Sequence, residues 1–574
     1  MKDKKRIRQL LNQIYNPIIA GQIIERLGSV LDKYRGQIPD QPSSGLNEHD
    51  IIVIVYPDQV QEANRAPLQS LGDFCEHFLK GTVSGIHLLP FFPSSSDDGF
   101  SVIDYRVVDS QYGSWNDVKS LYANFRLMFD AVINHASVQS SWFKRFISDD
   151  KDFDEYFIEV EGSPDLSNVV RPRALPLLTN FNTSNGTKEI WTTFSADQAD
   201  LNYHNPAVLL NILDILLDYV KKGADFIRLD AVAYLWKEIG TTCINLKQTH
   251  WIVQLIRAVL DEVVPTVMLI TETNVPHDEN ISYFGDGINE AQLIYNFPLP
   301  PLVLYAFYTG DAQVLSHWAS NLKLPSERTT YFNFLASHDG IGLNPIRGIL
   351  TDAEIEDLVQ RTKARGGLVS FKTDSNGMQS PYELNINYLD ALSNPDEPVD
   401  ILLRRFITAH AILLAIAGIP GIYFHSLFGS RGWPEGVIQT GHNRSINREK
   451  LDRSALQAEL ENTHSLRSQV FIHFKHLISV RTQNPAFKPQ SEQHVLKVNS
   501  EVFALLRIDK YFEKSVLCFH NVSAKTILVN ADLSLLPYKY PIRLLDLISN
   551  EQIDVVEKSL TFTLAPYQSA WFAK

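Results

Sequence analysis

The sequence contains few cysteines and fewer basic than acidic residues, and both shortages exclude kinds of protein. Its 3 cysteines among 574 residues are Cys75, Cys243 and Cys518, and none belongs to a CxxC pair. A disulfide framework or a cysteine-based zinc site is therefore not expected, and three buried, reduced thiols are predicted. Lys and Arg number 52 against 66 Asp and Glu, so the formal net charge is −14. Nucleic acids and anionic membranes require a basic surface, so neither is expected as a partner.

Long apolar stretches are also absent. Residues 406–424 are the one segment that could suggest a membrane span, but His410 and the break at residues 418–421 make it too short. We predict a buried helix there that leads into a buried strand. Residues 1–16 are basic without the apolar centre of a secretory signal, and we predict an amphipathic helix for them. Together these features predict a cytoplasmic protein without a membrane contact.

What the sequence does contain is a repeated alternation of strand and helix patterns. The chain is too long for one compact core, and its 44% apolar and 21% charged residues are ordinary for a globular protein. Short β-branched runs alternate with helical patterns such as 208–222 and 249–263, which is typical of βα units around a parallel sheet. Eight strands are predicted, the number that a closed barrel requires, at 51–56, 85–90, 127–133, 226–232, 267–273, 292–297, 331–337 and 418–424.

Two connections are too long to be simple loops, and both leave the ends of strands where barrel enzymes build their active sites. After residue 480 the pattern changes to short alternating runs, at 502–508, 515–519, 526–529, 542–547 and 560–564. The predicted fold is α/β, a (β/α)8 TIM barrel with insertions after strands 3 and 7 and a C-terminal antiparallel β domain. Its parts are an N-terminal helical extension (1–50), barrel segments (51–135, 206–344 and 401–485), two insertions (136–205 and 345–400) and the C-terminal domain (486–574).

Polar residues end four of the apolar strands. Asn134-His135 follows the third strand, Arg228 and Asp230 end the fourth, Glu272 ends the fifth, and His338-Asp339 follows the seventh. A single aspartate at a strand end more often caps a helix or forms an ion pair at the rim. Four such sites in succession are different, because a barrel brings all the strand ends around one cavity.

Two carboxylates that face each other across such a cavity suit the cleavage of a glycosidic bond. One must be ionised to attack the anomeric carbon, and the other must carry a proton for the leaving oxygen. Asp230 lies two residues after Arg228, on the same face of the strand, so the cation favours an ionised nucleophile. Glu272 has no cation beside it in the sequence, so a raised pKa and an acid/base role are predicted. Asp339 is expected to bind sugar hydroxyls and support the transition state.

In this order, the four segments resemble the motifs of the α-amylase superfamily. Carried over residue by residue, the resemblance implies that Asp230 is the nucleophile, Glu272 the acid/base and Asp339 the transition-state stabiliser. It also places Arg228, His135 and His338 around the bound glucose.

A narrower resemblance to the sucrose phosphorylase group is carried by the segment His87 to Tyr105 and by Arg444-Ser-Ile-Asn-Arg448. It implies that Asp97 and Arg444 hold the far end of the glucosyl unit and close the pocket behind it. Phe100 and Phe194 would form an aromatic wall, and Gln198 would bind in the same pocket. A pocket closed behind one glucose suits an enzyme that removes a single glucosyl unit.

Within that group the segments at 171–179, 270–277 and 337–348 are most similar to the glucosylglycerate phosphorylases. The implied reaction is cleavage of 2-O-α-D-glucosyl-D-glycerate by phosphate. An arginine-rich acceptor site would suit two anionic acceptors, and its candidates are Arg171, Arg173 and Arg347, together with Tyr382 and Glu383. The alternative is that these arginines pair with neighbouring carboxylates, and Glu383 has no evident role beside an anion.

Three rival functions remain open at this point. They are a sucrose phosphorylase (or a relative acting on sucrose phosphate or glucosylglycerol), a hydrolase or transglucosylase, and an inactive amylase-like binding subunit. The predicted partners are small molecules, an α-glucoside and phosphate, and a homodimer is left open. Neither a metal nor an organic cofactor is required. Asn134 matches a calcium-site position of amylases, but the sequence offers no convincing set of oxygen ligands around it.

Overall fold

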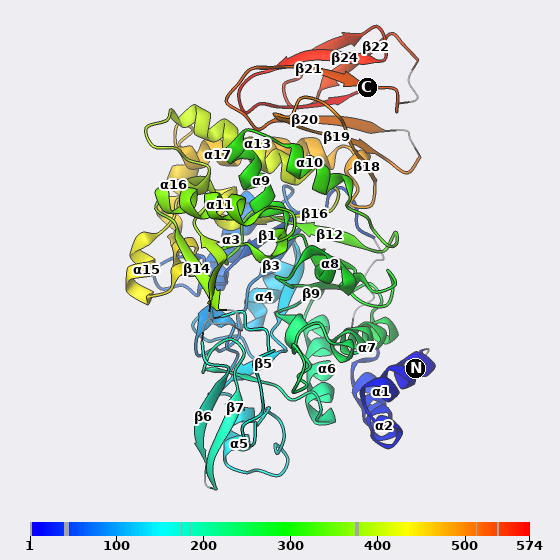
Figure 1. Ribbon diagram of the computed structural model, residues 1–574, viewed down its shortest axis with the longest axis vertical. Coiled ribbons are helices and arrows are strands. Elements are labelled where there is room, and N and C mark those ends of the chain that lie inside the picture. The colour runs from blue at the N-terminus through cyan, green and yellow to red at the C-terminus, as the bar shows by residue number, and fades with distance from the viewer. Residues whose placement is uncertain are drawn as a thin grey trace.

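Eight short apolar strands close into one parallel barrel in the computed structural model, which describes residues 3–38, 45–173, 175–183, 185–373, 378–511, 514–536 and 539–574 (Figure 1). The strands follow one another around the barrel in chain order. They are β1 (Ile52–Val55), β3 (Gly85–Leu88), β4 (Arg126–Ala131), β9 (Ala224–Leu229), β10 (Met268–Thr271), β11 (Leu293–Tyr295), β12 (Thr330–Asn333) and β16 (Ile419–Tyr423). Each overlaps a predicted strand, so the (β/α)8 prediction is confirmed.

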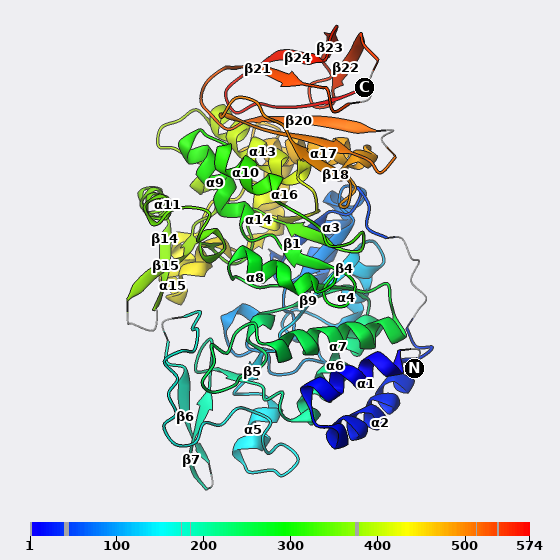
Figure 2. The same cartoon turned by 45° about the vertical axis from the view of Figure 1, so that its right-hand side comes forward.

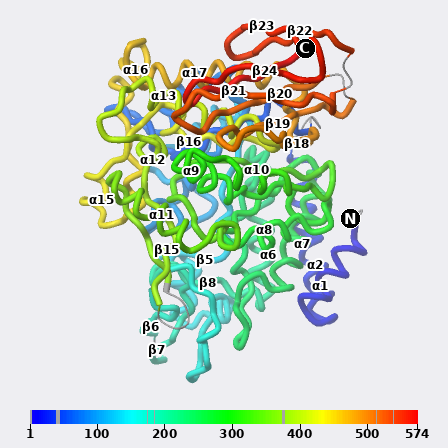
Figure 3. Tube along the Cα trace, turned by 45° about the horizontal axis from the view of Figure 1, so that its top comes forward, coloured from blue at the N-terminus to red at the C-terminus, as the bar shows by residue number. Residues whose placement is uncertain are grey.

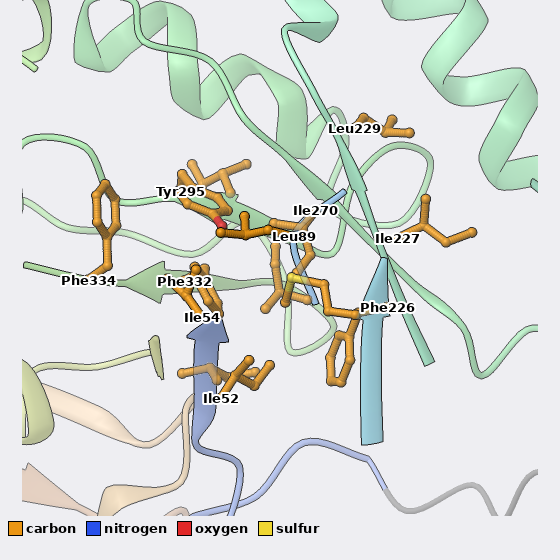
Figure 4. Close-up of a cluster of buried hydrophobic side chains, with 14 of the residues drawn as sticks. Ile52, Ile54, Leu89, Phe226, Ile227, Leu229, Ile270, Tyr295, Phe332 and Phe334 are labelled. Carbon is orange, nitrogen blue, oxygen red and sulfur yellow. The ribbon is translucent and has the colours of Figure 1, made fainter. Parts of the chain in front are cut away.

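Side chains on both faces of these strands are buried, one set inside the barrel and the other beneath the helices, as expected for a parallel sheet covered by helices. Figure 4 shows Ile52, Phe226, Ile270 and Phe332 among the apolar side chains packed together there. Gly421 on β16 is required by this packing, because a Cβ atom at that position would lie 2.4 Å from the ring of Phe332.

Helices form the outer layer around these strands. They include α3 (Pro67–Phe78), α4 (Trp115–Tyr122), α6 (Pro206–Lys221), α7 (Lys247–Val263), α8 (His277–Ile281), α9 (Leu299–Thr309), α10 (Gln313–Ser320), α13 (Val399–Ala415), α14 (Phe424–Leu427), α16 (Arg453–Glu461) and α17 (Leu466–Thr482). The buried helix and strand predicted for 406–424 are α13 and β16. No helix in the described ranges is both long and apolar enough to cross a membrane.

The N-terminal extension adds two helices to the outside of this layer. In Figure 2, α1 (Lys4–Ile14) and α2 (Pro17–Tyr34) lie beside α7 and α6, and α1 confirms the amphipathic helix predicted for 1–16. Asn16 caps α2 by accepting hydrogen bonds from the backbone N–H groups of Ile18 and Ile19, and Pro17 occupies its first turn. The buried face of α2 includes Leu27, whereas Ile18 points into solvent.

Both insertions leave the carboxyl ends of barrel strands. The one after β4 contains α5 (Ser141–Ile147), the hairpin β6 (Leu178–Thr183) and β7 (Gly186–Trp191), and the pair β5 (His135–Ser137) and β8 (Gln198–Asp200). The one after β12 contains α11 (Asp352–Ala364), α12 (Tyr388–Ala391) and a three-stranded sheet of β13 (Ile341–Gly342), β15 (Gln379–Asn385) and β14 (Leu368–Thr373). Shorter elements at the same rim are β2 (Val60–Gln61), β17 (Leu451–Asp452) and α15 (Pro434–Thr440).

The C-terminal strands gather at one end of the molecule and β6 and β7 at the other (Figure 3). An antiparallel sheet orders β18 (Glu492–Val495), β19 (Val502–Ile508), β20 (Ser515–Asn521), β25 (Ser569–Ala573), β22 (Ile542–Asp546) and β23 (Gln552–Val555), and β21 (Ile527–Asp532) pairs with β24 (Ser559–Leu564). The antiparallel prediction is confirmed. The prediction lacked β18, β23 and β25, because these strands are short, and the first two are largely polar.

A buried arginine attaches this sheet to the barrel. Arg507 on β19 donates to the carbonyl oxygen of Ala415 at 2.8 Å, and Arg481 on α17 donates to that of Leu414 at 2.5 Å, so both meet the last turn of α13. Burial lowers the pKa of Arg481 to about 9 and that of Arg507 to about 10. Helix carbonyls thus supply the partners that these guanidinium groups need inside the protein.

We expect Leu27→Ala to lower the free energy of unfolding by about 2–5 kcal/mol, because the side chain is 0% exposed against α6 and its removal leaves a cavity. Ile18→Ala on the same helix is the control, since that side chain is 77% exposed. Urea denaturation measures both. Equal losses in the two variants would contradict the docking of α2.

Candidate active site

Side chains from the carboxyl ends of the barrel strands and from both insertions meet around one hollow, which we call the main cavity. All of the predicted site residues except Arg171, Arg228 and Arg347 line it. They are Asp97, Phe100, His135, Arg173, Phe194, Gln198, Asp230, Glu272, His338, Asp339, Tyr382, Glu383 and Arg444.

Arg228 lies buried beneath this cavity and holds two aspartates. Its Nη1 donates to Asp230 Oδ1 at 3.0 Å and to Asp130 Oδ1 at close range. The other oxygen of Asp130 lies 2.8 Å from His87 Nε2. Strand register makes this arrangement possible, since Asp130 on β4 is paired with Arg228 on β9. The chain turns directly after Asp230, where Ala231 has a left-handed φ of 48°.

Glu272 faces the same region from the end of β10. Its Oε2 accepts a hydrogen bond from the backbone N–H of Ala231 at 3.2 Å, and Arg228 Nη2 is 3.9 Å away. Glu272 has no cation beside it in the sequence, but the fold brings Arg228 to it. Arg228 stands between the two carboxylates.

Burial raises the pKa of Asp230 well above its ordinary range, and the neighbouring carboxylates add to this against the effect of Arg228. This corrects the expectation that Arg228 alone would hold the pKa of Asp230 down, because Asp130 shares the same guanidinium. Burial also raises the pKa of Glu272. The two groups titrate as a pair, and we assign their shared proton to Glu272, since Arg228 lies closer to Asp230.

Asp339 is held ionised by arginines on the other side of the cavity. Arg444 Nη1 lies 2.6 Å from Asp339 Oδ1, and Arg448 Nη2 lies 3.6 Å from the same atom. Partial removal from solvent acts in the opposite direction, but these cations lower the pKa of Asp339 below its ordinary range. Burial lowers the pKa of His338 to about 3, so this ring is neutral at ordinary pH, and Phe100 stacks on it at 4.9 Å.

Asp97 forms the far end of the cavity. Its Oδ2 accepts hydrogen bonds from Arg173 Nη2 at 2.8 Å and from Gln198 Nε2 at 3.5 Å. His135 Nε2 donates to the carbonyl oxygen of Phe100 at 2.9 Å, and the ring of Phe194 lies 5.3 Å from that of His135. Polar groups and two aromatic rings thus surround this part of the cavity.

Glu383 acquires a role that the sequence did not reveal. Its carboxylate forms a two-point ion pair with Arg444, with Oε2 at 3.0 Å from Nε and Oε1 at 2.9 Å from Nη2. Arg444 is therefore shared between Glu383 and Asp339. Gly340 leaves room for this pair, because a Cβ there would lie 2.5 Å from Glu383 Cγ. The neighbouring Tyr382 accepts a hydrogen bond from Asn274 Nδ2 at 3.2 Å.

The arginines expected in an acceptor site are only partly brought together. Arg171 is exposed and lines no part of the main cavity, contrary to the expectation. Arg173 lines the cavity but is paired with Asp97, which is the alternative considered from the sequence. Arg347 lines a neighbouring cavity, with Nη1 3.8 Å from the exposed Asp352.

Several residues of the site were not predicted from the sequence. Asp130, His87 and Arg448 hold the groups already described, and a charge on an otherwise apolar barrel strand is the signal that could have found the first two. Lys237 is another: its buried ammonium group lies 2.8 Å from Asn134 Oδ1 and forms an ion pair with Asp200.

A lysine therefore contacts the oxygen that matches the calcium position of amylases. The described ranges contain no group of three His, Cys, Asp or Glu residues arranged to hold a metal ion.

Residues 55–341 match the family described as alpha amylase, catalytic domain. The chain belongs to the α-amylase family. A glucosylglycerate phosphorylase of Spirochaeta thermophila is 49% identical over 91% of this chain and 90% of its own length. Another, of Allomeiothermus silvanus, is 46% identical over 96% and 95%. The crystal structure of sucrose 6F-phosphate phosphorylase from Thermoanaerobacter thermosaccharolyticum shares the fold, with a TM-score of 0.74 and 23% identity over 90% of this chain and 100% of that one.

In this α-amylase family protein, Glu383→Ala should lower the free energy of unfolding by about 1.5–3 kcal/mol, because it removes a buried carboxylate from Arg444, which is 25% exposed and keeps Asp339 as a partner. The control is Asp400→Ala, which breaks the exposed pair with Arg404 and should cost less than about 1 kcal/mol. Chemical denaturation measures both. A loss at Glu383 no larger than that at Asp400 would show that the Glu383–Arg444 pair stabilises the fold no more than an exposed ion pair does.

Proposed function

We propose that the protein is a retaining glycoside phosphorylase that converts 2-O-α-D-glucosyl-D-glycerate and phosphate into α-D-glucose 1-phosphate and D-glycerate. The observation that carries the reaction type is the buried pair Asp230 and Glu272 with Arg228 between them. The choice of glycerate is supported by the relatives named glucosylglycerate phosphorylase, which are 49% and 46% identical over nearly the whole chain.

In the first step the glucosyl unit occupies the part of the main cavity lined by Asp97 and Arg444. Asp230 attacks C1, and the bond from C1 to the glycerate oxygen breaks as Glu272 gives that oxygen its proton. The products of this step are free glycerate, an ionised Glu272 and a β-glucosyl ester on Asp230. Asp339, held ionised by Arg444 and Arg448, stabilises the positive charge that develops on the sugar ring.

In the second step phosphate enters the space that glycerate leaves. One of its oxygens attacks C1 from the opposite face, the ester bond to Asp230 breaks, and the phosphate proton can return to Glu272. Two inversions at C1 give α-D-glucose 1-phosphate with retention. Phosphate carries acidic protons of its own, so this step demands less from Glu272 than an attack by water would.

We also propose the cytoplasm as the compartment of this reaction. Cys75, Cys243 and Cys518 are buried as free thiols. Unpaired cysteines of this kind fit a reducing compartment.

A substrate panel tests the reaction. With phosphate present, we expect glucose 1-phosphate to form from glucosylglycerate, and at least about tenfold more slowly from sucrose, sucrose 6F-phosphate and glucosylglycerol. A coupled assay for glucose 1-phosphate measures each substrate. Turnover of sucrose alone would reject the proposed substrate, and release of free glucose that phosphate does not redirect would indicate a hydrolase instead.

The roles of the two carboxylates are tested by a substrate that needs no proton to leave. Glu272→Gln should lower the phosphorolysis of glucosylglycerate by about 10²–10⁴-fold, but affect α-glucosyl fluoride far less. Because the folded site raises the pKa of Glu272, the wild-type rate should fall as pH rises through that pKa, and the variant should lose this decline. Asp230→Ala should abolish both reactions. Wild-type turnover of either substrate in Asp230→Ala would overturn the mechanism.

A further inference from the structure

A second hollow adjoins the main cavity, and we call it the side cavity. Tyr234 and Asn274 line both of them, so these two side chains form the shared wall. The far wall of the side cavity contains Asn344 and Arg347, which follow β13, and Lys372 on β14. The side cavity has about 360 Å³ of free space against about 80 Å³ in the main cavity. Its lining residues place the side cavity between the barrel rim at Asn274 and the insertion after β12.

The charged residues that line the two cavities give them opposite net charge. Carboxylates predominate in the main cavity, where Arg173 and Arg444 are the cations among the described lining residues and both are paired with acids. Cations predominate in the side cavity, where Arg347 and Lys372 stand against Glu279. The carboxylate of Glu279 accepts a hydrogen bond from Asn245 Nδ2 at 2.6 Å. An anion approaching Glu272 is thus repelled by one cavity and attracted by the other.

Polar atoms of the side cavity lack partners in the described part of the chain. Arg347 donates through Nη2 to the carbonyl oxygen of Pro381 at 3.1 Å, but its buried Nε has no acceptor there. The buried side-chain oxygens of Asn274 and Asn344 have no donor. Buried groups left in this state cost free energy, so a ligand that both accepts and donates hydrogen bonds would be stabilised beside them.

Both acceptors of the proposed reaction have this chemistry. In glycerate the carboxylate is attached to the carbon that bears the reacting oxygen, and in phosphate the charged oxygens share one phosphorus with it. The reacting oxygen is separated from the oxyanion by two carbons in glycerate and by the phosphorus alone in phosphate, and each acceptor also carries hydroxyl donors. Asn274 lines both cavities beside these acceptors, and Arg347 lines the side cavity with it.

We propose that the side cavity is the oxyanion subsite of the acceptor, in which Arg347 and Lys372 bind the carboxylate of glycerate in one half-reaction and phosphate in the other. This rests on the proposed function. Arg347 is the principal ligand, because its guanidinium is anchored through Nη2 and its buried Nε has no acceptor in the described ranges. Lys372 adds a second positive charge. The wall residue Asn274 receives the hydroxyl donors of either acceptor.

The test uses α-glucosyl fluoride as the donor. This donor is uncharged, so any effect of a lost positive charge on KM reports on binding of the acceptor. Arg347→Gln should raise the KM for glycerate at least about tenfold, and should leave the KM for glycerol, an uncharged acceptor, within about twofold. With glycerate replaced by phosphate, the KM for phosphate should rise by a similar factor. Lys372→Gln should act in the same direction, and more weakly. Lys363→Gln, an exposed change in the same insertion that lines neither cavity, should alter none of these values.

Retained transfer to glycerol shows that Arg347→Gln is folded and active, so a rise in both oxyanion KM values supports the proposal. An unchanged KM for glycerate or for phosphate would overturn the shared subsite, and so would an equal rise for glycerol. A wild-type enzyme that uses neither glycerate nor phosphate would instead reject the proposed function. The two failures are therefore distinguishable.

Discussion

The buried guanidinium of Arg228 is the group on which the site depends. It lies in the barrel between carboxylates from three neighbouring strands, in contact with Asp130 and Asp230 and 3.9 Å from Glu272. A guanidinium at this depth would cost several kcal/mol without such partners, so the fold and the site rely on the same ion pairs. In the proposed mechanism, the distances to this one cation distinguish Asp230, which attacks, from Glu272, which holds the proton. Asp130, fixed by His87, keeps the guanidinium in place.

Ion pairing divides the remaining charges between two ends of the site. At the glucosyl end, Arg444 is shared by Asp339 and Glu383, and Arg173 is paired with Asp97. These cations are largely neutralised before a ligand arrives, which suits a sugar that presents hydroxyl groups and no charge. At the other end, Arg347 and Lys372 face the side cavity, which suits an anion. One chain thus offers a polar pocket to glucose and a positive one to its acceptor.

The barrel could be predicted from the sequence because each of its strands is a short apolar segment with helical patterns on either side. The same reasoning placed Asp230, Glu272 and Asp339 around one cavity, since a barrel brings the ends of all its strands together. It did not find β18 and β23, whose polar sequences form strands only because β19 and β22 pair with them. Among the arginines, Arg171 and Arg347 were indistinguishable in sequence, and the path of the insertions alone places one outside both cavities and the other in the side cavity.

By itself, then, the sequence determined the (β/α)8 barrel and the identity of the strand-end carboxylates, because both follow from local patterns of apolar and polar residues. Tertiary structure decided the partners of those carboxylates. Arg228 is two residues from Asp230 in the chain, yet the pKa of Asp230 is raised, because burial and the acids on β4 and β10 outweigh one shared cation. Glu383 was unexplained in sequence because its partner, Arg444, lies 61 residues away. Electrostatic free energy depends on distance and burial in three dimensions, and a linear pattern records neither.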